Sequence, residues 1–359
     1  MTPSSQHARQ SGHAALGVLA ALLATGALAP TARALSTDDC LGCHANDHDS
    51  VVKLADGSSF QVFVDPRKWK SSVHGGKLAC TDCHLNITDY PHPAVTATSA
   101  RAFELAQGQS CKRCHFAFYT RMLDGIHYKL LEAGNEKAPT CVDCHGAHAI
   151  TNPQVPRLSI TQRCAKCHRR IVETFKKSVH GEALVDGNPD VPVCTDCHGA
   201  HDIHDPTRPA FHTASYELCA KCHADEKRMA KYGLSPAVVT TYLQDFHGHS
   251  NHLYQMGAGR PGRPMATCTD CHGVHDIQAV EKGQTRAEMQ ARIIQRCRRC
   301  HDNAPLQFAS AWMFHYEPTL SKAPLVWAIK WAYRFIIPTI VLGLVLHILL
   351  HLFRVRTHR

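Results

Sequence analysis

The sequence predicts a fold of short α-helices and loops, with minimal β-structure, one hairpin and one transmembrane helix near the C-terminus. Three features of the 359 residues support this fold class. One pentapeptide, with Cys at its first and fourth positions and His at its fifth, occurs nine times. An Asp-Gly pair lies between two alternating apolar runs, and an uncharged apolar segment precedes the last arginines. Because the pentapeptides follow one another closely, they leave little room for long helices or a larger sheet.

The nine pentapeptides contain all 18 cysteines of the chain. Two thiols three positions apart can bond the two vinyl groups of haem, while the adjacent imidazole reaches the iron. Each pentapeptide therefore predicts one covalent haem c, nine in all, with helices and loops wrapped around them. The cysteines expected to bind haem are Cys40, Cys43, Cys80, Cys83, Cys111, Cys114, Cys141, Cys144, Cys164, Cys167, Cys194, Cys197, Cys219, Cys222, Cys268, Cys271, Cys297 and Cys300. The iron ligands expected from the same motifs are His44, His84, His115, His145, His168, His198, His223, His272 and His301.

Structural zinc and disulfides are the alternatives for these cysteines. Paired C-x-x-C zinc sites fit the spacing, but they do not require His directly after every second Cys. Disulfides within C-x-x-C would close loops too short to stabilise the chain, because the stabilisation grows with loop length. Both alternatives are therefore rejected in favour of haem.

The first 34 residues have the pattern of an export signal. Arg9 precedes an apolar run, and the small residues Ala32 and Ala34 mark a cleavage site. We expect residues 1–34 to be removed and the mature chain to begin near Leu35 in a periplasm, where covalent haem attachment takes place.

An apolar segment of 19 residues without formal charge, Phe335 to Phe353, can cross a bilayer, since it would be about 28 Å long as a helix. An aromatic belt is expected on its outer side. Its members are Trp327, Trp331 and Tyr333.

The export signal fixes the expected orientation of the chain. Residues 35–323 would form a periplasmic nine-haem domain, and residues 324–359 a single-pass anchor with a short cytoplasmic tail. The expected location is the bacterial inner membrane, with the C-terminus in the cytoplasm.

The composition indicates how the haem region is stabilised. The formal net charge is +9, but each haem would add about two propionate charges. The basic side chains are therefore expected to pair with propionates, and no nucleic-acid partner is predicted. Each haem has only about 32 residues around it, too few for an apolar core of its own. We expect the porphyrins to form the core.

The motifs occur in a repeat. The first stands alone and precedes a hairpin predicted from Val51 to Val64, with its turn at Asp56-Gly57. A two-haem unit then occurs four times. Each unit has an opening His, an acidic-type motif with Asp at its third position, a near His, and a basic-type motif with Lys or Arg at its third position. The third unit, from His180 to His223, shows the pattern most fully.

Nine further histidines occupy equivalent places in this repeat and predict the second axial ligand of each iron. They are the opening histidines His74, His127, His180, His247 and His315, and the near histidines His92, His148, His201 and His275.

The chain gaps predict how some of these histidines pair. Gaps of twelve to fourteen residues after the basic-type motifs suggest a short helix that carries the chain across the haem ring. The pairs expected are His115 with His127, His168 with His180, His301 with His315, His44 with His74 and His223 with His247. The near histidines lie close to their own motif in sequence and are expected to reach a neighbouring haem.

Several other side chains are weaker candidates for iron ligands. His212 or His252 could displace one of the nine distal candidates, and Met256 or Met265 could give a His/Met haem. Apolar residues at helical spacing predict helices around the basic-type motifs. Their ranges are Ile160 to Lys177, Ala214 to Tyr232, Ser235 to Phe246 and Thr285 to Cys300.

The chain resembles the multihaem c-type cytochromes, in particular the membrane-attached nonahaem group associated with a b-type cytochrome. The resemblance covers about residues 38–353 and rests on the Ser-Val-His-Gly and Cys-Thr-Asp-Cys-His-Gly-x-His strings and on Leu346-His347-Ile-Leu-Leu350. It implies low-potential haems with two His ligands, stacked alternately in parallel and near-perpendicular pairs. It also implies exchange of electrons between the quinone pool and periplasmic acceptors.

The resemblance also implies a membrane partner. Family members with a fused b-type domain continue through several membrane helices, whereas this chain ends at Arg359. A separate b-type cytochrome or other quinone-reactive subunit is therefore expected, besides a periplasmic redox partner. His347 and His351 lie one helical turn apart in the span, where an ionisable group usually faces protein. His347 is a candidate for binding a shared haem b or a quinone.

Two hypotheses for the function follow. The first is a non-enzymatic electron carrier, or the electron-transfer subunit of an oxidoreductase, that connects the quinone pool to periplasmic or extracellular acceptors in anaerobic respiration. The second is a reductase of a small nitrogen or sulfur oxyanion, which needs one iron with an open position. All nine motifs end in His and nine distal candidates exist, so the first hypothesis is favoured and no catalytic residue is predicted.

Overall fold

The computed structural model describes most of the chain after the expected export signal. The described residues are 35–256, 265–279, 285–308, 315, 317–321 and 323–357. The export signal predicted at residues 1–34 lies outside them. The described part is mostly helical, with one two-stranded sheet and one long apolar helix towards the C-terminus, as the sequence predicts.

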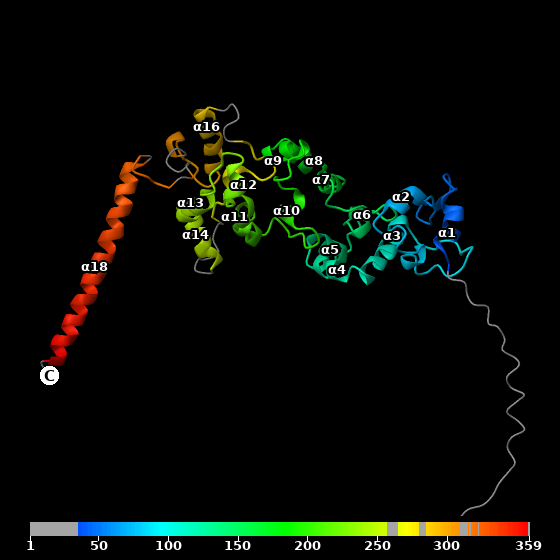
Figure 1. Ribbon diagram of the computed structural model, residues 1–359, viewed down its shortest axis with the longest axis horizontal. Coiled ribbons are helices and arrows are strands. Elements are labelled where there is room, and N and C mark those ends of the chain that lie inside the picture. The colour runs from blue at the N-terminus through cyan, green and yellow to red at the C-terminus, as the bar shows by residue number, and fades with distance from the viewer. Residues whose placement is uncertain are drawn as a thin grey trace, which may run out of the picture.

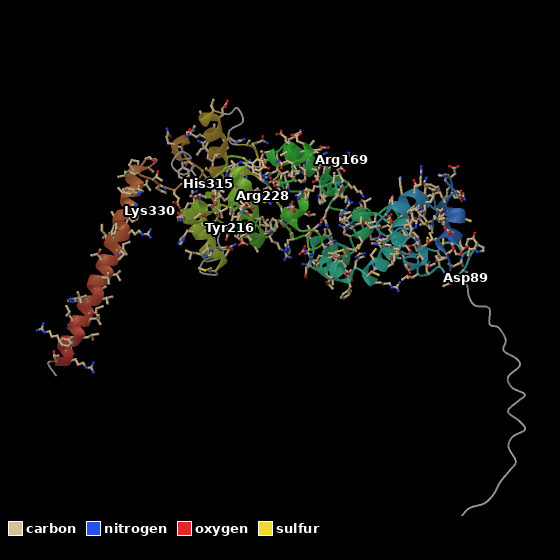
Figure 2. The ribbon with its side chains drawn as sticks, in the orientation of Figure 1. Asp89, Arg169, Tyr216, Arg228, His315 and Lys330 are labelled. Atoms are coloured by element: carbon tan, nitrogen blue, oxygen red, sulfur yellow. The ribbon has the colours of Figure 1, made fainter. Side chains whose placement is uncertain are left out.

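The elements follow one another along the long axis of the molecule (Figure 1). Helix α1 (Thr37–His44) lies at one end, and α18 (Pro324–Thr357) extends from the other. Figure 2 shows Asp89 at the end opposite to His315 and Lys330. The order of the pentapeptides in the sequence is therefore also their order in space.

Most helices between these two ends are short, because each of them either contains a pentapeptide or connects two. They are α2 Pro66–Ser71, α3 Ala100–Gly108, α4 Phe116–Leu123, α5 Ile126–Glu132, α6 Cys141–His145, α7 Leu158–Ala165, α8 Arg169–Lys176, α9 Val179–Val185, α10 Cys194–His198, α11 Pro209–His223, α12 Glu226–Ala230, α13 Val238–Gln244, α14 Phe246–Gln255, α15 Cys268–His272 and α16 Arg286–Cys297. Two 3₁₀ helices are η1 Cys80–Asp82 and η2 Gln109–Arg113.

The helix predicted over Ile160 to Lys177 is two helices, α7 and α8. The break lies at the end of the basic-type motif, where His168 has φ −98° and ψ 41° outside the helical region. His115 has nearly the same backbone angles before α4. His115 and His168 are thus the residues directly before a new helix, which begins at the next position.

The predicted hairpin is confirmed. Strands β1 (Val51–Lys53) and β2 (Ser59–Gln61) pair antiparallel, with Val52 opposite Phe60. Gly57 closes the turn with φ 82°, a conformation that glycine adopts without steric cost. The Phe60 ring stacks on Phe103 of α3 at 4.6 Å, so the hairpin is packed against the first two-haem unit.

Buried apolar side chains are few. Among the described residues ten hydrophobic side chains are buried, and the cluster around Ile294 and Ala304 contains only those two fully buried members. Large apolar rings such as Phe116, which is 63% exposed, lie at the surface of the polypeptide. The polypeptide alone therefore buries too little apolar surface to stabilise a domain of this length.

One backbone hydrogen bond joins successive two-haem units and recurs with each of them. The residue before an opening His donates its N–H to an Ile carbonyl that lies two residues beyond the near His of the following unit. The bonds are Val73 to Ile150, Ile126 to Ile203 and Val179 to Ile277, each 2.8 Å long. The units are therefore connected in the same way at three junctions.

Gly181, directly after the opening His180, brings two helices close together. A Cβ at this position would overlap the carbonyl oxygen of Phe175 at the end of α8. We expect Gly181→Ala to lower the free energy of unfolding by about 1–3 kcal/mol, because α9 must move away from α8. Thermal unfolding of the full chain measures this effect.

Gly108→Ala is the matched control for this prediction. Gly108 is helical, and no heavy atom lies within 4 Å of a Cβ built there. This variant should unfold at the wild-type temperature or slightly above it. Equal effects of the two substitutions would contradict the packing argument.

Within the described residues, α18 is the one helix long and apolar enough to cross a membrane. Its 34 residues are about 51 Å long, more than the roughly 30 Å of a bilayer's hydrocarbon core. Trp327 and Trp331 lie on this helix with their rings 6.2 Å apart, and the Arg334 guanidinium lies 5.4 Å from the Trp331 ring. The aromatic residues expected at the membrane boundary are thus continuous with the apolar segment.

Candidate haem-binding sites

Each acidic-type motif is a single turn of helix that its own Asp caps. Asp143 accepts the Thr140 N–H at 2.7 Å, in front of α6. The same bond recurs in the other three motifs, from Ala79 to Asp82, Val193 to Asp196 and Thr267 to Asp270, at 2.7 to 2.8 Å. Because residues three and four apart share a helix face, this capped turn holds both thiols and the imidazole on one side.

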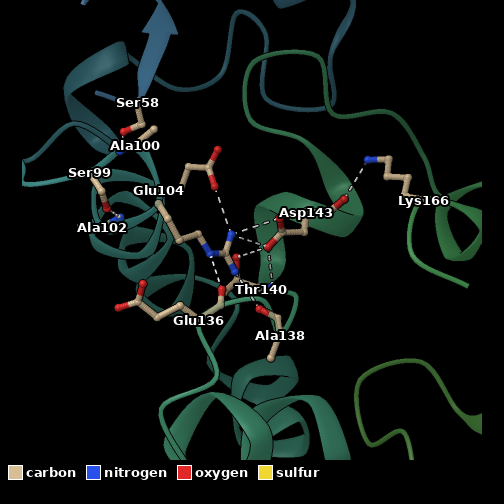
Figure 3. Close-up of polar contacts among 11 residues, drawn as sticks. Ser58, Ser99, Ala100, Ala102, Glu104, Glu136, Ala138, Thr140, Asp143 and Lys166 are labelled. Carbon is tan, nitrogen blue, oxygen red and sulfur yellow. Dashed lines mark hydrogen bonds and ion pairs between the residues drawn. The ribbon is translucent and has the colours of Figure 1, made fainter. Parts of the chain in front are cut away.

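The basic-type motifs use their third position differently. Lys166 donates from Nζ to the backbone carbonyl of Asp143 at 2.8 Å (Figure 3). Arg113 reaches the carbonyl of Asp82 at 3.5 Å in the first unit. In these two units the basic residue therefore ties its motif to the acidic-type motif of the same unit, a role that the sequence pattern alone did not reveal.

Every motif histidine faces one of the nine predicted distal histidines. The ring centroids are 5.9 to 6.3 Å apart in all nine pairs. The pairs are His44 with His92, His84 with His148, His115 with His74, His145 with His201, His168 with His127, His198 with His275, His223 with His180, His272 with His315 and His301 with His247.

This spacing fits one iron between each pair of rings. A metal–nitrogen bond is about 2 Å long, and an imidazole centroid lies about 1 Å beyond its nitrogen, so two axial rings are about 6 Å apart. The planes of the paired rings meet at angles from 6° to 57°. Such variation is compatible with axial ligation, because each ring can rotate about its bond to the metal.

The pairing expected from the chain gaps is wrong. His115 faces His74 rather than His127, and His168 faces His127 rather than His180. The same holds for the other three expected pairs: His301 faces His247, His44 faces His92 and His223 faces His180. The eight-residue helices α4 and α8 explain the difference, because each carries the chain about 12 Å away from its motif instead of across a ring.

Two pairing rules describe the whole repeat. An opening His faces the basic-type motif of its own unit, as His127 faces His168. A near His faces the acidic-type motif of the preceding unit, as His148 faces His84. In the first unit, His92 faces His44 of the lone first motif. His315, expected to open a fifth unit, follows the second rule and faces His272. Pairs within a unit thus alternate with pairs that join two units.

Comparison with known proteins agrees with these motifs. Residues 133–173, which include two of the pentapeptides, match the family model for the doubled CXXCH motif. A high-molecular-weight cytochrome c from Nitratidesulfovibrio vulgaris is 24% identical over 191 residues, which are 52% of this chain and 28% of that protein. The chain thus matches little more than a quarter of that relative's length. No solved structure matches the chain.

These findings support a multihaem c-type cytochrome. The CXXCH motifs indicate covalently bound haem c, and the similarity to a high-molecular-weight cytochrome c suggests electron transfer.

Burial favours the neutral form of several of the paired rings. It lowers the pKa of His180 and of His272 to about 4, and the facing ring of each pair adds a smaller contribution in the same direction. Burial likewise lowers the pKa of His84 and His148. A neutral imidazole has the free lone pair that a metal ligand needs.

Polar contacts hold the outer nitrogen of some rings. His44 Nδ1 lies 2.7 Å from the Val62 carbonyl, just after strand β2. His315 Nδ1 lies 3.4 Å from Thr241 Oγ1 of α13. Such bonds select the tautomer that leaves the other nitrogen free for a metal. The hairpin therefore positions a ligand of the first motif.

Cysteine side chains of successive motifs are neighbours at three places. The Cys111 side chain lies beside Cys141 and lowers the pKa of the Cys141 thiol to about 7. Equivalent thiol contacts recur twice along the chain, between Cys164 and Cys194 and between Cys219 and Cys268. In each case the first cysteine of a basic-type motif meets the first cysteine of the next acidic-type motif.

The other candidate ligands lie elsewhere. His212 Nε2 is 2.8 Å from Asp270 Oδ2, and the His252 side chain is exposed. The Met256 side chain is 62% exposed. None of these side chains faces a motif histidine within the described part of the chain.

His74→Ala tests the reassigned pairing. We expect it to leave the iron on His115 without its second axial ligand, so that one haem of nine becomes high-spin in the ferric spectrum. His204→Ala, at an exposed position outside the nine pairs, should leave every haem low-spin. A fully low-spin spectrum of His74→Ala would contradict the pairing.

Proposed function

We propose that the chain is a membrane-attached electron-transfer protein that carries nine haems in series between the quinone pool and periplasmic or extracellular acceptors. The observation that supports this best is the set of nine facing histidine pairs, each with ring centroids 5.9 to 6.3 Å apart. Haem c supplies reversible one-electron exchange when bound.

The chain's own residues favour electron transfer over substrate reduction. With a histidine on both sides of each iron position, no open position is left for a nitrogen or sulfur oxyanion. Neutral, buried rings such as His180 and His272 bind the metal without losing a proton first. Because both histidines would stay bound, the axial ligands of each iron would not change when an electron arrives or leaves.

The linear order of the sites supports a route along the chain. The last two motifs, Cys268–His272 and Cys297–His301, are the ones nearest in sequence to α18, and the first motif is in α1 at the opposite end (Figure 1). Electrons would therefore enter or leave near the membrane at these last two motifs and exchange with a periplasmic partner near Cys40–His44.

A membrane partner is part of this proposal. We place the haem region in the periplasm and α18 across the inner membrane, beside a b-type cytochrome or other quinone-reactive subunit. His347 in the apolar part of α18 supports such a contact, because an ionisable side chain in a membrane usually faces protein. It is also the residue that would help to bind a shared haem b or a quinone.

The ferric spectrum of the purified full-length protein tests the proposed function. We expect nine low-spin haems with two nitrogen ligands each, and no change when nitrite or hydroxylamine is added. A high-spin haem that binds either molecule would favour the reductase instead.

A further inference from the structure

A side chain from one two-haem unit contacts the acidic-type motif of the next unit at three junctions. The contacts join Arg101 to Asp143 at 3.0 Å, Arg157 to Asp196 at 2.8 Å and His212 to Asp270 at 2.8 Å. Each of these aspartates caps its own motif and lies directly before the second cysteine of that motif. We call Arg101, Arg157 and His212 the clasp residues.

The clasp residues lie where the helices that lead into the basic-type motifs begin. Arg101 is on α3, which η2 follows directly, Arg157 is the N-cap of α7, and His212 lies on α11. Arg157 and His212 each lie seven residues before the first cysteine of a basic-type motif, Cys164 and Cys219. Seven helical residues are about 10 Å long. The same short helix thus carries a clasp residue near its start and a haem cysteine near its end.

Each of these helices meets the next acidic-type motif at a second point. Helix α3 packs on α6, α7 packs on α10, and α11 packs on α15. Thr161 Oγ1 of α7 lies 3.7 Å from Cys194 Sγ. Ser215 of α11 donates to the hydroxyl of Thr267, the N-cap of α15, at 3.0 Å. Two points of contact fix the angle between two motifs as well as their separation.

Arg101 uses three different nitrogens in its contacts with the second unit. Its Nη1 donates to Asp143 at 3.0 Å, its Nη2 to the Ala138 carbonyl at 2.7 Å and its Nε to the Glu136 carbonyl at 2.8 Å (Figure 3). Ala138 and Glu136 lie three and five residues before Cys141. The guanidinium therefore holds both the cap of the fourth site and the chain that enters this site.

Arg157 makes its two bonds through one nitrogen. Its Nη2 donates to Asp196 at 2.8 Å and to the Val191 carbonyl at 2.9 Å. Val191 lies three residues before the first cysteine of its motif, as Ala138 does, so the two arginines hold equivalent parts of the chain. His212 contacts its aspartate through Nε2 alone. The clasp contacts thus become fewer from the first junction to the third.

We propose that the clasp residues are positioning residues, which set the geometry between the two haem sites on either side of each junction. This inference rests on the proposed function. The clasped sites are the third and fourth, the fifth and sixth, and the seventh and eighth. Short bonds from a planar guanidinium to a carboxylate leave little freedom of movement. Because electron exchange between two sites slows steeply as their separation grows, a loose junction would slow the step across it.

Electron paramagnetic resonance of the full-length, haem-loaded protein tests the clasps directly. Neighbouring low-spin ferric haems interact magnetically, and this interaction depends on their separation and angle. Arg101→Gln should change the signals of two haems of the nine, those of the third and fourth sites. Arg67→Gln is the control, because Arg67 is 94% exposed and its ion-pair partner Asp65 is two residues away in the chain. This control should leave all nine signals unchanged.

Lysine variants separate positioning from charge alone. Lysine keeps the positive charge but donates from a single nitrogen. Arg101→Lys cannot reach three acceptors and should change the same two signals as Arg101→Gln. Arg157→Lys should keep the wild-type signals, since Arg157 donates from one nitrogen, whereas Arg157→Gln should change those of the fifth and sixth sites. Wild-type spectra for both lysine variants would mean that charge suffices and would contradict positioning.

Rapid-mixing reduction of the membrane-bound protein by quinol gives a second readout. The slow step should appear at the junction whose clasp is removed. In Arg101→Gln the six sites on the α18 side should be reduced quickly and the other three slowly. In Arg157→Gln the four sites on the α18 side should be fast and the other five slow. A general loss of stability would not move the slow step from one junction to another.

The outcomes separate this inference from the proposed function. Wild-type spectra and rates in Arg157→Gln, with nine haems bound, would overturn the clasp inference alone. This variant loses fewer bonds than Arg101→Gln, so the test stands even where the Arg101 variant takes up fewer haems. A wild type that lacks low-spin haems would overturn the proposed function and the clasp inference together.

Discussion

Loss of the fourth haem site is expected to stop electrons from crossing the chain. The double variant Cys141→Ser and Cys144→Ser removes both thioether bonds of that site. Its place in the series is internal, because three motifs precede it and Lys166 of the fifth motif donates to the Asp143 carbonyl within it. With one site missing, the gap between its neighbours becomes the length of two steps.

Rapid-mixing reduction of the membrane-bound protein by quinol measures this effect. The five sites on the α18 side of the gap should be reduced quickly, whereas the three sites on the α1 side should stay oxidised. The matched control is Cys40→Ser with Cys43→Ser, which removes the terminal site and should leave the other eight fully reducible. Fast reduction of all eight remaining sites in the internal variant would contradict a serial route.

Removal of residues 324–359 is expected to abolish reduction by membrane quinol while leaving the haem sites intact. No residue of α18 is buried, and the nine histidine pairs lie before it in the chain. The shortened protein should be soluble and should bind haem as the full chain does, because no histidine pair is lost. It should no longer reach the quinone-reactive subunit.

Two controls accompany the truncation. Dithionite, a soluble reductant, should still reduce the shortened protein completely, which shows that its haems are functional. His347→Leu in the full chain should weaken quinol-dependent reduction more than His351→Leu, since His351 lies closer to the end of the apolar segment. Retained reduction by quinol in the shortened protein would contradict the need for a membrane partner.

The sequence predicted the local features of this fold well. The hairpin around Gly57 and the long apolar helix follow from patterns confined to a few adjacent residues. The nine pentapeptides likewise carry their chemistry within five residues. Such features depend little on the rest of the chain, so a single sequence is enough to predict them.

The pairing of the histidines could not be predicted in the same way. His127 lies twelve residues after His115 and 41 residues before His168, yet it faces His168. Helix α4 leads the chain away from His115, and the path back to the next motif depends on contacts between units, such as the bond from Ile126 to Ile203. Distance along the chain gives no measure of such contacts.

The clasp residues were missed for a related reason. The capping role of Asp143 could have been inferred from its place three residues after Thr140, which is the spacing of a capping box. Its partner Arg101 lies 42 residues away and has no motif of its own. The match between Arg157 and His212 becomes visible only when the repeat is aligned on the cysteines of the basic-type motifs.

Intact-mass spectrometry of the mature exported chain tests the central claim most directly, because every site described above depends on a covalently bound haem. The predicted result is a chain that begins near Leu35 and carries nine covalent haems, one for each pair of cysteines. A chain with fewer haems, or with zinc or disulfides at the cysteines, would contradict it.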